Sequence, residues 1–597
     1  MIKYNYFVLY IYNVSLLSGV ILRNIALALI FVYFIFPLAA EKKTAYLVYG
    51  GYLLFTLFFL ANFFYSSYFG NYLSISDIIG GGNTGRFSLI EIWINNLLET
   101  GGYLFLLDLV ILPFLIYKDE EKKEKYSLKK VFTSRSYSRL VPLIIIIVLL
   151  VGQIFITNSF LGGHSPGKLY QKGTKNFVNV YGILPLYAAE IYDRTYPKKF
   201  NKKEDKPELM GGQLKGKGLI DEKTNIIVIQ CESIDAKLID FTYNEREVTP
   251  FLNQLKKEGL YFNNFYAQHV NGSFNADFSF LTSLYPESRK YTYRDLDLTE
   301  FDSLISVLND KGYETQAYHG YDPTFFNRKQ AFSELGFDDF YGRPEYSREE
   351  SVMEVERTLM GINDYDFFKQ SLALLEKTEE PFFSLFITVT SHKPFDYYPS
   401  AEKIEEFSDI ENKYVRDYFN SIAFLDQALE MFYKELENRG MLEDTLLVLY
   451  SDHESGIDEE LYSSARDFEL ESNVKQPEHI PLLVLHPELE AKTVEKTGTP
   501  TDLAPTILDL LGEKEIPAEF AGNSLFSNQQ HPVLFLNDIP QVLYKNQLFL
   551  KDNGDFKQVG HVGESELQDI DFSSEEKQEL IELIQYIKND IYTRLRK

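Results

Sequence analysis

Long apolar segments recur through the first 157 residues of the chain. Five of them are about as long as a helix needs to cross roughly 30 Å of hydrocarbon: Lys3–Leu22, Asn24–Ala40, Thr44–Phe69, Gly101–Tyr117 and Leu140–Thr157. This pattern predicts an N-terminal transmembrane domain of five helices over residues 1–157. Helices buried in a protein core are the alternative interpretation.

The basic residues between these segments predict how the domain is oriented. Lys3, the segment Glu41–Lys43 and the basic stretch Lys118–Arg139 fall on one side of a five-helix domain. Because cytoplasmic loops carry an excess of Lys and Arg, this side is predicted to be cytoplasmic. The chain after Thr157 is then predicted to be extracellular, on a multi-pass protein of the cell membrane.

Residues 158–222 differ in character from the segments on either side. They contain the glycine pairs Gly162-Gly163 and Gly211-Gly212 and the charged run Lys198–Lys206. Such composition predicts an extracytoplasmic linker. The apolar patch Phe177–Ile191 within it predicts a short helix at the membrane interface, with a helix packed against a domain as the alternative.

Residues 223–530 alternate short β-branched or aromatic runs with longer helical stretches. This alternation predicts an α/β domain with a mostly parallel central sheet. The predicted strands are Ile226–Gln230, Leu260–Tyr266, Thr315–Tyr318, Phe382–Val389, Leu446–Tyr450 and Ile480–Leu485, and the predicted helices lie near Pro250–Lys257, Ser303–Asp310, Lys413–Glu437 and Asp502–Leu511. Residues 531–597 predict a small antiparallel sheet, with strands at Val533–Leu536 and Val542–Leu550, followed by a helix from Ser574.

Charge and cysteine content exclude some functional classes. The 597 residues include 59 Lys and Arg against 86 Asp and Glu, which gives a net charge of −27. Nucleic acid is therefore not expected as a partner, because its binding depends on clustered basic residues. The single cysteine, Cys231, excludes an intramolecular disulfide and a cysteine-based zinc cluster.

Reactive side chains follow five of the predicted strands. Ligands of open α/β sheets bind beyond the carboxyl ends of the strands, so residues at these positions can share one site. In chain order they are Glu232, then Asn271-Gly272-Ser273, then His319 with Arg328, then Ser391-His392, and finally Asp452-His453. Their coincidence predicts a site that combines a metal ion with a nucleophile.

The residue types at these strand ends suit a divalent cation. Two carboxylates and an imidazole, from Glu232, Asp452 and His453, are ligands for Mn²⁺, Mg²⁺ or Zn²⁺. Ser273 is a candidate fourth ligand, and coordination would lower the pKa of its hydroxyl and make it a nucleophile at neutral pH.

The other polar residues of the set suit an anionic substrate or support the local fold. Arg328, His319 and His392 are donors that can bind a phosphate or sulfate oxygen. Asn275 and Asp277 are expected to cap the start of a helix, with orientation of Ser273 as the alternative. No chemistry is assigned to His269.

Several of these residues lie in segments that resemble a known family. The segments are Asn225–Ser233, Phe265–Tyr285, His319–Arg328, Ser391–Phe395, Ser451–His453 and Asp502–Gly512. Together with the five apolar segments they resemble the lipoteichoic acid synthase family, which are phosphoglycerol transferases of the alkaline phosphatase and sulfatase superfamily. The resemblance implies a sulfatase-like catalytic domain over residues 223–530.

The resemblance also implies roles for particular residues. The metal ligands would be Glu232, Ser273, Asp452 and His453, with Ser273 as the nucleophile, and the glycerophosphate pocket would be lined by His319, Phe326, Arg328 and His392. One divalent metal ion is implied, with Mn²⁺ preferred to Mg²⁺ or Zn²⁺. The implied donor is membrane phosphatidylglycerol, and the implied acceptor is a glycolipid-anchored polyglycerolphosphate chain.

The chain departs from the family pattern at three positions. Ser273 stands where Thr is usual, Phe326 where an indole is typical, and Glu454 where Gly is common. Ser279 is the nearest rival nucleophile. Phosphoethanolamine transfer, phosphodiester hydrolysis and sulfate-ester hydrolysis remain alternatives at the same site, although the Cys/Ser-x-Pro-x-Arg pattern that sulfatases need is missing around Ser273. A catalytically silent relative that binds teichoic acid or lipid is the alternative from another class.

Overall fold

The computed structural model describes four main ranges, residues 42–69, 137–160, 174–195 and 214–594, together with single positions between 23 and 75 and residues 166 and 170. Within the last range it leaves out residues 271, 287–290, 348–360, 458–467, 472–473, 529–530, 538, 553–554, 564–567, 569 and 571. The chain divides into two compact units. The first comprises residues 1–82 and 86–197, and the second comprises residues 83–85 and 198–597.

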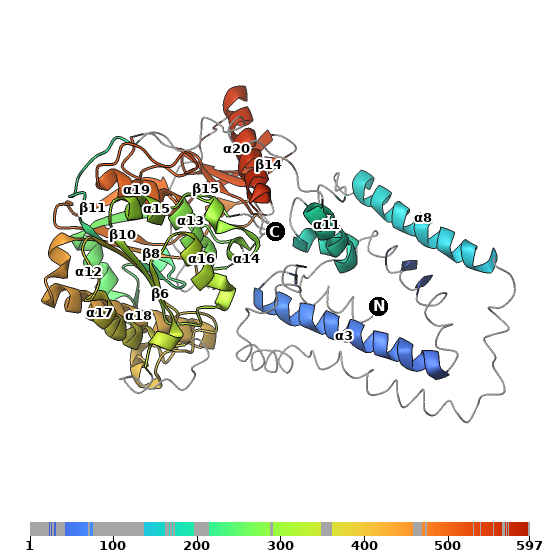
Figure 1. Cartoon of the computed structure of the whole chain (residues 1–597), viewed down its shortest axis with the longest axis horizontal. Coiled ribbons are helices and arrows are strands. Elements are labelled where there is room, and N and C mark those ends of the chain that lie inside the picture. Colours follow the sequence, from blue (N-terminus) through green and yellow to red (C-terminus); the bar gives the residue numbers. More distant parts are fainter. Residues whose placement is uncertain are drawn as a thin grey trace. The chain divides into compact units, whose positions relative to one another are not determined.

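The described part of the first unit is helical (Figure 1). Its helices are α3 (Lys42–Phe69), α8 (Tyr137–Phe160), α10 (Thr174–Tyr181) and α11 (Ile183–Thr195). Two of them, α3 and α8, coincide with the predicted apolar segments Thr44–Phe69 and Leu140–Thr157. Among the described residues, no helix combines the length and the apolar character of a membrane span. The predicted segments Lys3–Leu22, Gly101–Tyr117 and most of Asn24–Ala40 lie outside the described residues.

The short helices α10 and α11 pack within the first unit. Phe177, Val178 and Leu186 are buried in one apolar cluster with Phe59 of α3. The Arg23 guanidinium donates to the carbonyl oxygens of Val178 and Val180, which fixes the end of α10. The patch Phe177–Ile191 therefore forms packed helices, and the first unit extends to residue 197, past the predicted start of the linker.

The second unit is built around an eight-stranded sheet of order β11-β4-β10-β8-β1-β7-β5-β6. The strands are β1 (Asn225–Cys231), β4 (Leu260–Phe265), β5 (Glu314–His319), β6 (Asp339–Tyr341), β7 (Phe382–Ile387), β8 (Thr445–Ser451), β10 (Leu482–Leu485) and β11 (Lys492–Gly498). Only β10 runs antiparallel to its neighbours, β4 and β8, and the other pairs are parallel. The predicted mostly parallel α/β sheet is thus confirmed.

Successive side chains of each strand point to opposite faces of the sheet, so apolar side chains lie on both faces. Helices cover both of them. They are α12 (Pro250–Glu258), α13 (Phe274–Thr282), α14 (Thr292–Asp295), α15 (Leu304–Asp310), α16 (Arg328–Glu334), α17 (Asp364–Leu375), α18 (Lys413–Asn438) and α19 (Leu503–Leu510). Ile227 and Ile229 of β1 point to the core under α12, α17 and α18. On the other face, Phe280 of α13 packs on Phe383 and Tyr450.

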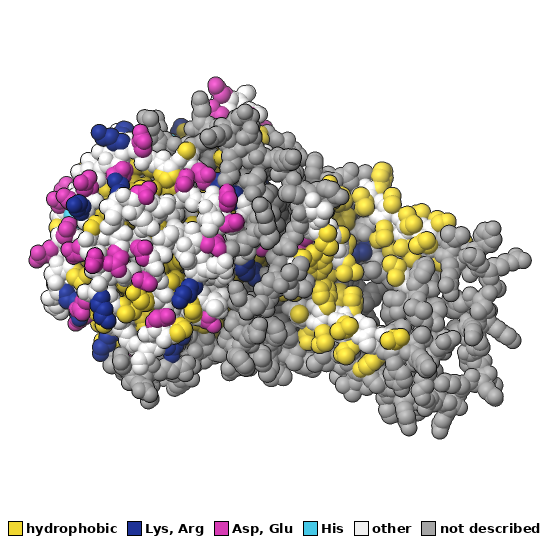
Figure 2. Space-filling model, viewed as in Figure 1, with side chains coloured by type: hydrophobic (Ala, Val, Ile, Leu, Met, Phe, Trp, Pro, Cys, Tyr) yellow, Lys and Arg dark blue, Asp and Glu magenta, His cyan; other side chains and the backbone are white. Residues whose placement is uncertain are grey.

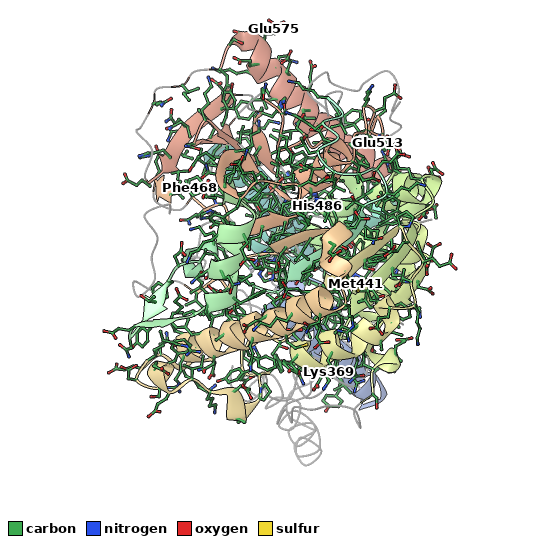
Figure 3. All side chains as sticks on the ribbon, turned by 90° about the vertical axis from the view of Figure 1, so that its left-hand side faces the viewer. Lys369, Met441, Phe468, His486, Glu513 and Glu575 are labelled. Atoms are coloured by element: carbon green, nitrogen blue, oxygen red, sulfur yellow. The ribbon has the colours of Figure 1, made fainter. Side chains whose placement is uncertain are left out.

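A second, antiparallel sheet completes the unit. Its order is β12-β13-β14-β15-β9, and it confirms the predicted small antiparallel sheet. The strands are β12 (Val533–Phe535), β13 (Gln541–Tyr544), β14 (Gln547–Asp552), β15 (Asp555–Val562) and β9 (Phe468–Leu470), followed by α20 (Ser574–Thr593); β2 (Thr242–Tyr243) and β3 (Arg246–Glu247) form a separate hairpin. The unexpected member is β9, which comes from within the predicted larger domain; Figure 3 labels its Phe468, and Glu575 near the start of α20. Tyr266 packs on Phe468 and Phe535 and joins the two sheets.

Candidate active site

Three predicted metal ligands meet at the carboxyl ends of two neighbouring strands. Glu232 follows β1 and Asp452-His453 follow β8, and these strands pair in parallel up to Cys231 opposite Ser451. One ligand atom from each of the three side chains lies within 4.8 Å of the others. His453 Nε2 is 3.3 Å from Glu232 Oε1 and 3.6 Å from Asp452 Oδ2. The structure therefore brings these predicted residues together.

Hydrogen bonds from the surrounding backbone and side chains fix the three ligands. The chain turns sharply at Ser233, whose φ is 57°, so that its N–H donates to Asp452 Oδ1 at 2.9 Å and its hydroxyl donates to Glu232 Oε1 at 2.8 Å. His453 Nδ1 is 2.8 Å from the carbonyl oxygen of Glu454, which makes it the protonated nitrogen. Nε2 then faces the carboxylates and is the ring nitrogen that could bind a metal ion.

Ser273 stands at the start of α13 with its hydroxyl directed at this group. Its Oγ is 3.3 Å from Glu232 Oε2 and 3.5 Å from His453 Nε2. Gly272 before it has a φ of 153°, and a Cβ there would lie 3.0 Å from the Phe274 ring. The rival Ser279 is fully buried within α13. Of the two serines, Ser273 is the one in contact with the predicted ligands.

Burial and mutual interactions strongly perturb the pKa values of the three predicted ligands. Burial, followed by the charge of Glu232, raises the pKa of Asp452 to about 8. Burial opposes protonation of His453, but Asp452 and Glu232 outweigh it and raise the pKa of the imidazole to about 10. Burial also acts against the charge of Glu232, yet His453 and His392 hold its pKa below the ordinary value. Two carboxylates, an imidazole and a hydroxyl in this arrangement fit a divalent metal ion.

Arg328 is held rigidly by two buried partners. Its Nε donates to Asp277 Oδ2 at 3.0 Å, and its Nη1 donates to His319 Nε2 at 2.9 Å. His319 Nδ1 in turn donates to the carbonyl oxygen of Ile387 at 3.0 Å, so both ring nitrogens are engaged. Burial and the charge of Arg328 lower the pKa of His319 to about 3, which keeps the imidazole neutral. Asp277 therefore binds Arg328, and the prediction that it caps a helix is wrong.

Phe326 and His392 lie on loops at the same edge of the sheet. The ring centroid of Phe326 is 4.5 Å from that of Phe274, the residue after Ser273, and 6.3 Å from that of Tyr291. His392 follows β7, is half-buried, and binds the carbonyl oxygen of Lys393 through Nδ1 at 2.8 Å.

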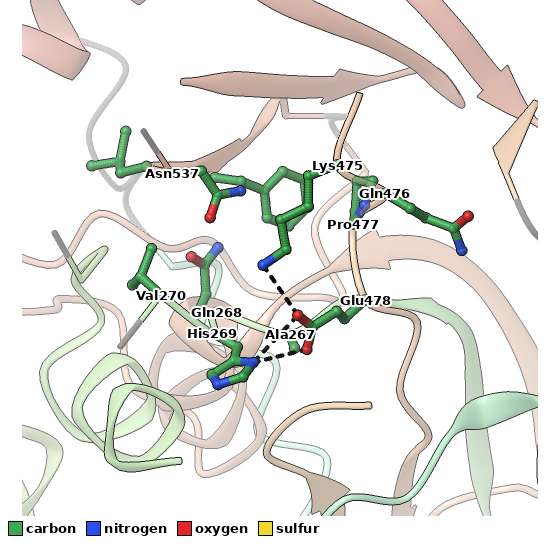
Figure 4. A pocket seen from close by; sticks show the side chains of 11 residues that line it. Ala267, Gln268, His269, Val270, Lys475, Gln476, Pro477, Glu478 and Asn537 are labelled. Carbon is green, nitrogen blue, oxygen red and sulfur yellow. Dashed lines mark hydrogen bonds and ion pairs between the residues drawn. The ribbon is translucent and has the colours of Figure 1, made fainter. Parts of the chain in front are cut away.

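Two residues beside the site were missed by the sequence analysis. The His269 ring stacks on the His453 ring with centroids 4.2 Å apart, and His269 Nδ1 lies 3.0 Å from Glu478 Oε2 (Figure 4). Burial lowers the pKa of His269. Burial favours the neutral form of Glu478 too, but His269 and Lys475 lower its pKa overall. His269 lies four residues after the end of β4, so its place in the chain was a usable signal.

Similarity to known proteins agrees with this geometry. A sequence model of the sulfatase family, described as "Sulfatase", matches residues 224–513. Lipoteichoic acid synthase 2 of Bacillus subtilis (strain 168) is 29% identical, over 84% of this chain and 77% of the relative. The lipoteichoic acid synthase of Staphylococcus saprophyticus is 28% identical, over 80% and 74%.

Among solved structures, the lipoteichoic acid synthase LtaP from Listeria monocytogenes has the same fold. It superposes with a TM-score of 0.55 and 23% identity, over 64% of this chain and 96% of LtaP. Sequence and fold thus point to one group of proteins. Residues 224–513 form a sulfatase-family domain, and the chain is a homologue of the lipoteichoic acid synthases.

Proposed function

We propose that this protein is a phosphoglycerol transferase that cleaves phosphatidylglycerol and transfers glycerophosphate to a lipoteichoic-acid-type polyglycerolphosphate chain. The observation that carries the proposal is the position of Ser273 Oγ, 3.3 Å from Glu232 and 3.5 Å from His453, in a homologue of lipoteichoic acid synthases. A serine hydroxyl beside carboxylates and an imidazole is the arrangement of an activated nucleophile.

Glu232, Asp452, His453 and Ser273 hold one divalent metal ion in this proposal, with Mn²⁺ preferred to Mg²⁺ or Zn²⁺. When bound, the ion lowers the pKa of the Ser273 hydroxyl and offsets negative charge on the phosphoryl group. The raised pKa of Asp452 supports this assignment, because burial and the charge of Glu232 disfavour its ionised form, which a bound cation would stabilise.

The reaction proceeds in two displacements at phosphorus. Ser273 Oγ attacks the phosphodiester, the bond between phosphorus and the diacylglycerol oxygen breaks, and the serine proton ends on the departing diacylglycerol. Glycerophosphate is then linked to Ser273. In the second displacement an acceptor hydroxyl attacks the same phosphorus, the bond to Ser273 Oγ breaks, and the hydroxyl proton returns to Ser273.

Arg328 binds the phosphate oxygens in this proposal. A guanidinium has five N–H donors in a planar fork, and the contacts with Asp277 and His319 use two of them. Asp277 orients the fork as a positioning residue. His319, which was predicted to line the glycerophosphate pocket, has both ring nitrogens engaged, so we assign it a positioning role as well. His392 adds a donor, and Phe326 with Phe274 gives the glycerol an apolar wall.

A membrane location is part of the proposal, with the catalytic domain extracellular. Both the lipid donor and diacylglycerol reside in a lipid leaflet, so an anchored enzyme meets them without leaving the membrane. Apolar side chains exposed along α8, among them Val141, Ile144, Val148 and Phe155, support this location (Figure 2). The arrangement of five membrane-spanning helices remains a prediction.

The direct test measures diacylglycerol release from fluorescent phosphatidylglycerol by the full-length, detergent-solubilised protein with Mn²⁺. We expect release that is lost in Ser273→Ala and in the presence of a chelator, and retained in Ser279→Ala. Absence of release by the wild-type protein contradicts the proposal. Phosphatidylethanolamine and an aryl sulfate, assayed in parallel, then separate a different substrate from a catalytically silent protein.

A further inference from the structure

A guanidinium lies over the aromatic wall of the proposed glycerol pocket. Arg294 belongs to α14, and its guanidinium carbon is 4.0 Å from the centroid of the Tyr291 ring and 5.7 Å from that of the Phe326 ring. The Phe326 ring lies 4.5 Å from that of Phe274, the residue after the candidate nucleophile Ser273. The roles proposed above do not use Arg294, although its charge lies close to any group that binds against Phe326.

The chain fixes Phe326 and Arg294 relative to each other. Phe326 belongs to a tight turn over residues 325–327, and the side-chain amide of Asn327 donates to the carbonyl oxygen of Tyr293 at 3.0 Å. Phe326 and Asn327 both have a positive φ, 52° and 63°, which is costly for residues other than glycine and depends on such contacts. The turn is thus tied to the residue before Arg294, so the ring and the charge keep their positions.

The charge of Arg294 changes what the aromatic wall can bind. The face of an aromatic ring attracts cations, so Tyr291 and Phe326 alone would favour a headgroup that ends in an ammonium group. Arg294 already occupies the face of Tyr291, and its guanidinium stays protonated at any ordinary pH. A second cation against Phe326 would be repelled by this charge, whereas the hydroxyl groups of a glycerol can accept hydrogen bonds from the guanidinium.

We propose that Arg294 is a specificity-determining residue, which favours the neutral glycerol headgroup and excludes headgroups that end in an ammonium group, such as that of phosphatidylethanolamine. This inference rests on the proposed function and specifies how its lipid donor is selected. Arg328 and the metal ion would bind the phosphate of either lipid, so the two lipids differ only in the part of the headgroup beyond the phosphate. Repulsion of the wrong partner is an effective way to discriminate between two such similar ligands.

The test measures the binding of two soluble headgroups, glycerol phosphate and phosphoethanolamine, to the full-length, detergent-solubilised protein with Mn²⁺. Both are phosphate monoesters, so the ratio of their affinities in isothermal titration calorimetry isolates the part beyond the phosphate. We expect the wild-type protein to prefer glycerol phosphate, and Arg294→Met to reduce this preference about tenfold or more, because the repelling charge is lost. Arg294→Lys keeps a charge and should keep most of the preference.

Lys256→Met is the matched control. Lys256 is a half-buried cation whose ammonium lies 4.8 Å from the centroid of the Tyr261 ring, but it belongs to α12, on the opposite face of the sheet from α13. Its substitution should leave the affinity ratio unchanged. Thermal unfolding of each variant checks that the fold is kept.

The outcomes separate this inference from the proposed function. A wild-type protein that does not prefer glycerol phosphate overturns the inference, and so does a ratio that is unchanged in Arg294→Met, because a merely structural residue would weaken both ligands alike. A ratio that falls as far in Arg294→Lys as in Arg294→Met overturns it too, since shape and not charge would then decide. Failure of the proposed function is a different result, namely no diacylglycerol release from phosphatidylglycerol by the wild-type protein.

Discussion

The pair formed by Asp277 and Arg328 gives the sharpest test of the proposed site. The side chains are 0% and 5% exposed, so solvent screens their interaction little. The substitution Asp277→Asn keeps the shape and an oxygen that can accept from Arg328 Nε, but it removes the negative charge. The charge-assisted part of the contact is lost, and with it the fixed orientation of the guanidinium.

The expected size follows from the contact that is lost. A hydrogen bond between charged groups contributes about 1.5–3 kcal/mol, and the retained neutral contact keeps part of it. We therefore expect kcat/KM for phosphatidylglycerol cleavage to fall about tenfold in Asp277→Asn, which corresponds to about 1.4 kcal/mol. Stability should change less, because removing a buried charge offsets the loss of the ion pair.

The pH dependence adds a second signature of the same pair. Burial raises the pKa of Asp277 from 3.8 to about 6, although Arg328 acts in the opposite direction. Wild-type activity should therefore fall as the pH drops through 6, because Asp277 takes up a proton and loses its charge. The native pKa exceeds the unfolded value, so the native state binds the proton more readily and is stabilised by it below pH 6, by up to roughly 3 kcal/mol at full protonation. Protonation of Asp277 therefore does not destabilise the native state, and a loss of activity at pH 5 cannot be attributed to acid unfolding caused by this residue.

The assay compares diacylglycerol release between pH 5 and pH 8 in wild type, Asp277→Asn and Asp502→Asn. Asp502 is the matched control, since burial raises its pKa to about 6 as well, but its partners are the backbone N–H groups of Thr499 and Asn523. Asp277→Asn should have low activity and a weaker decline towards pH 5, whereas Asp502→Asn should keep the wild-type profile. If Asp277→Asn follows the wild-type profile at wild-type rates, the positioning role of Asp277 is refuted.

Three further predictions concern the nucleophile, the metal and the core. Ser273→Ala should reduce diacylglycerol release at least about a thousandfold, and Ser279→Ala should stay within about threefold of wild type; equal losses would show that the nucleophile is misassigned. A chelator should lower the unfolding temperature, and Mn²⁺ at about 100 times its Kd should restore roughly 2.7 kcal/mol; a Mn²⁺ shift that persists in Asp452→Asn would place the ion elsewhere. Asp426→Ala should cost about 1–2 kcal/mol in urea unfolding, because Asp426 of α18 accepts from the first N–H groups of α12, and an unchanged midpoint would contradict that role.

The strands that the sequence predicts are those buried on both faces. β1 and β8 have every residue buried, and their continuous apolar runs are legible without the fold. By contrast β11, Lys492–Gly498, is a largely polar strand at the sheet edge, so no apolar run marks it in the sequence. Its strand conformation depends on hydrogen bonding to β4. The short strand β9 joins the small sheet through β15, almost a hundred residues later in the chain.

The candidate ligands were also predictable, for a reason of geometry. Glu232, Asp452 and His453 follow parallel neighbouring strands, and the carboxyl ends of such strands necessarily meet at one edge. Two carboxylates and one imidazole then indicate a binding site for a divalent cation. The local chain therefore determined which groups stand at the strand ends, and the pairing of β1 with β8 brought them together.

Only the tertiary structure decided what holds and flanks these groups. Asp277 and Arg328 are separated by 51 residues, and His269 and Glu478 by 209. Nothing in the local pattern around Asp277 distinguishes a helix cap from the partner of a buried guanidinium. Hydrophobic periodicity is set by neighbours in sequence, so the chain by itself determined its strands and their reactive ends. The choice of partner for a buried charge depends on which distant segment packs beside it, and that was decided by the folded core.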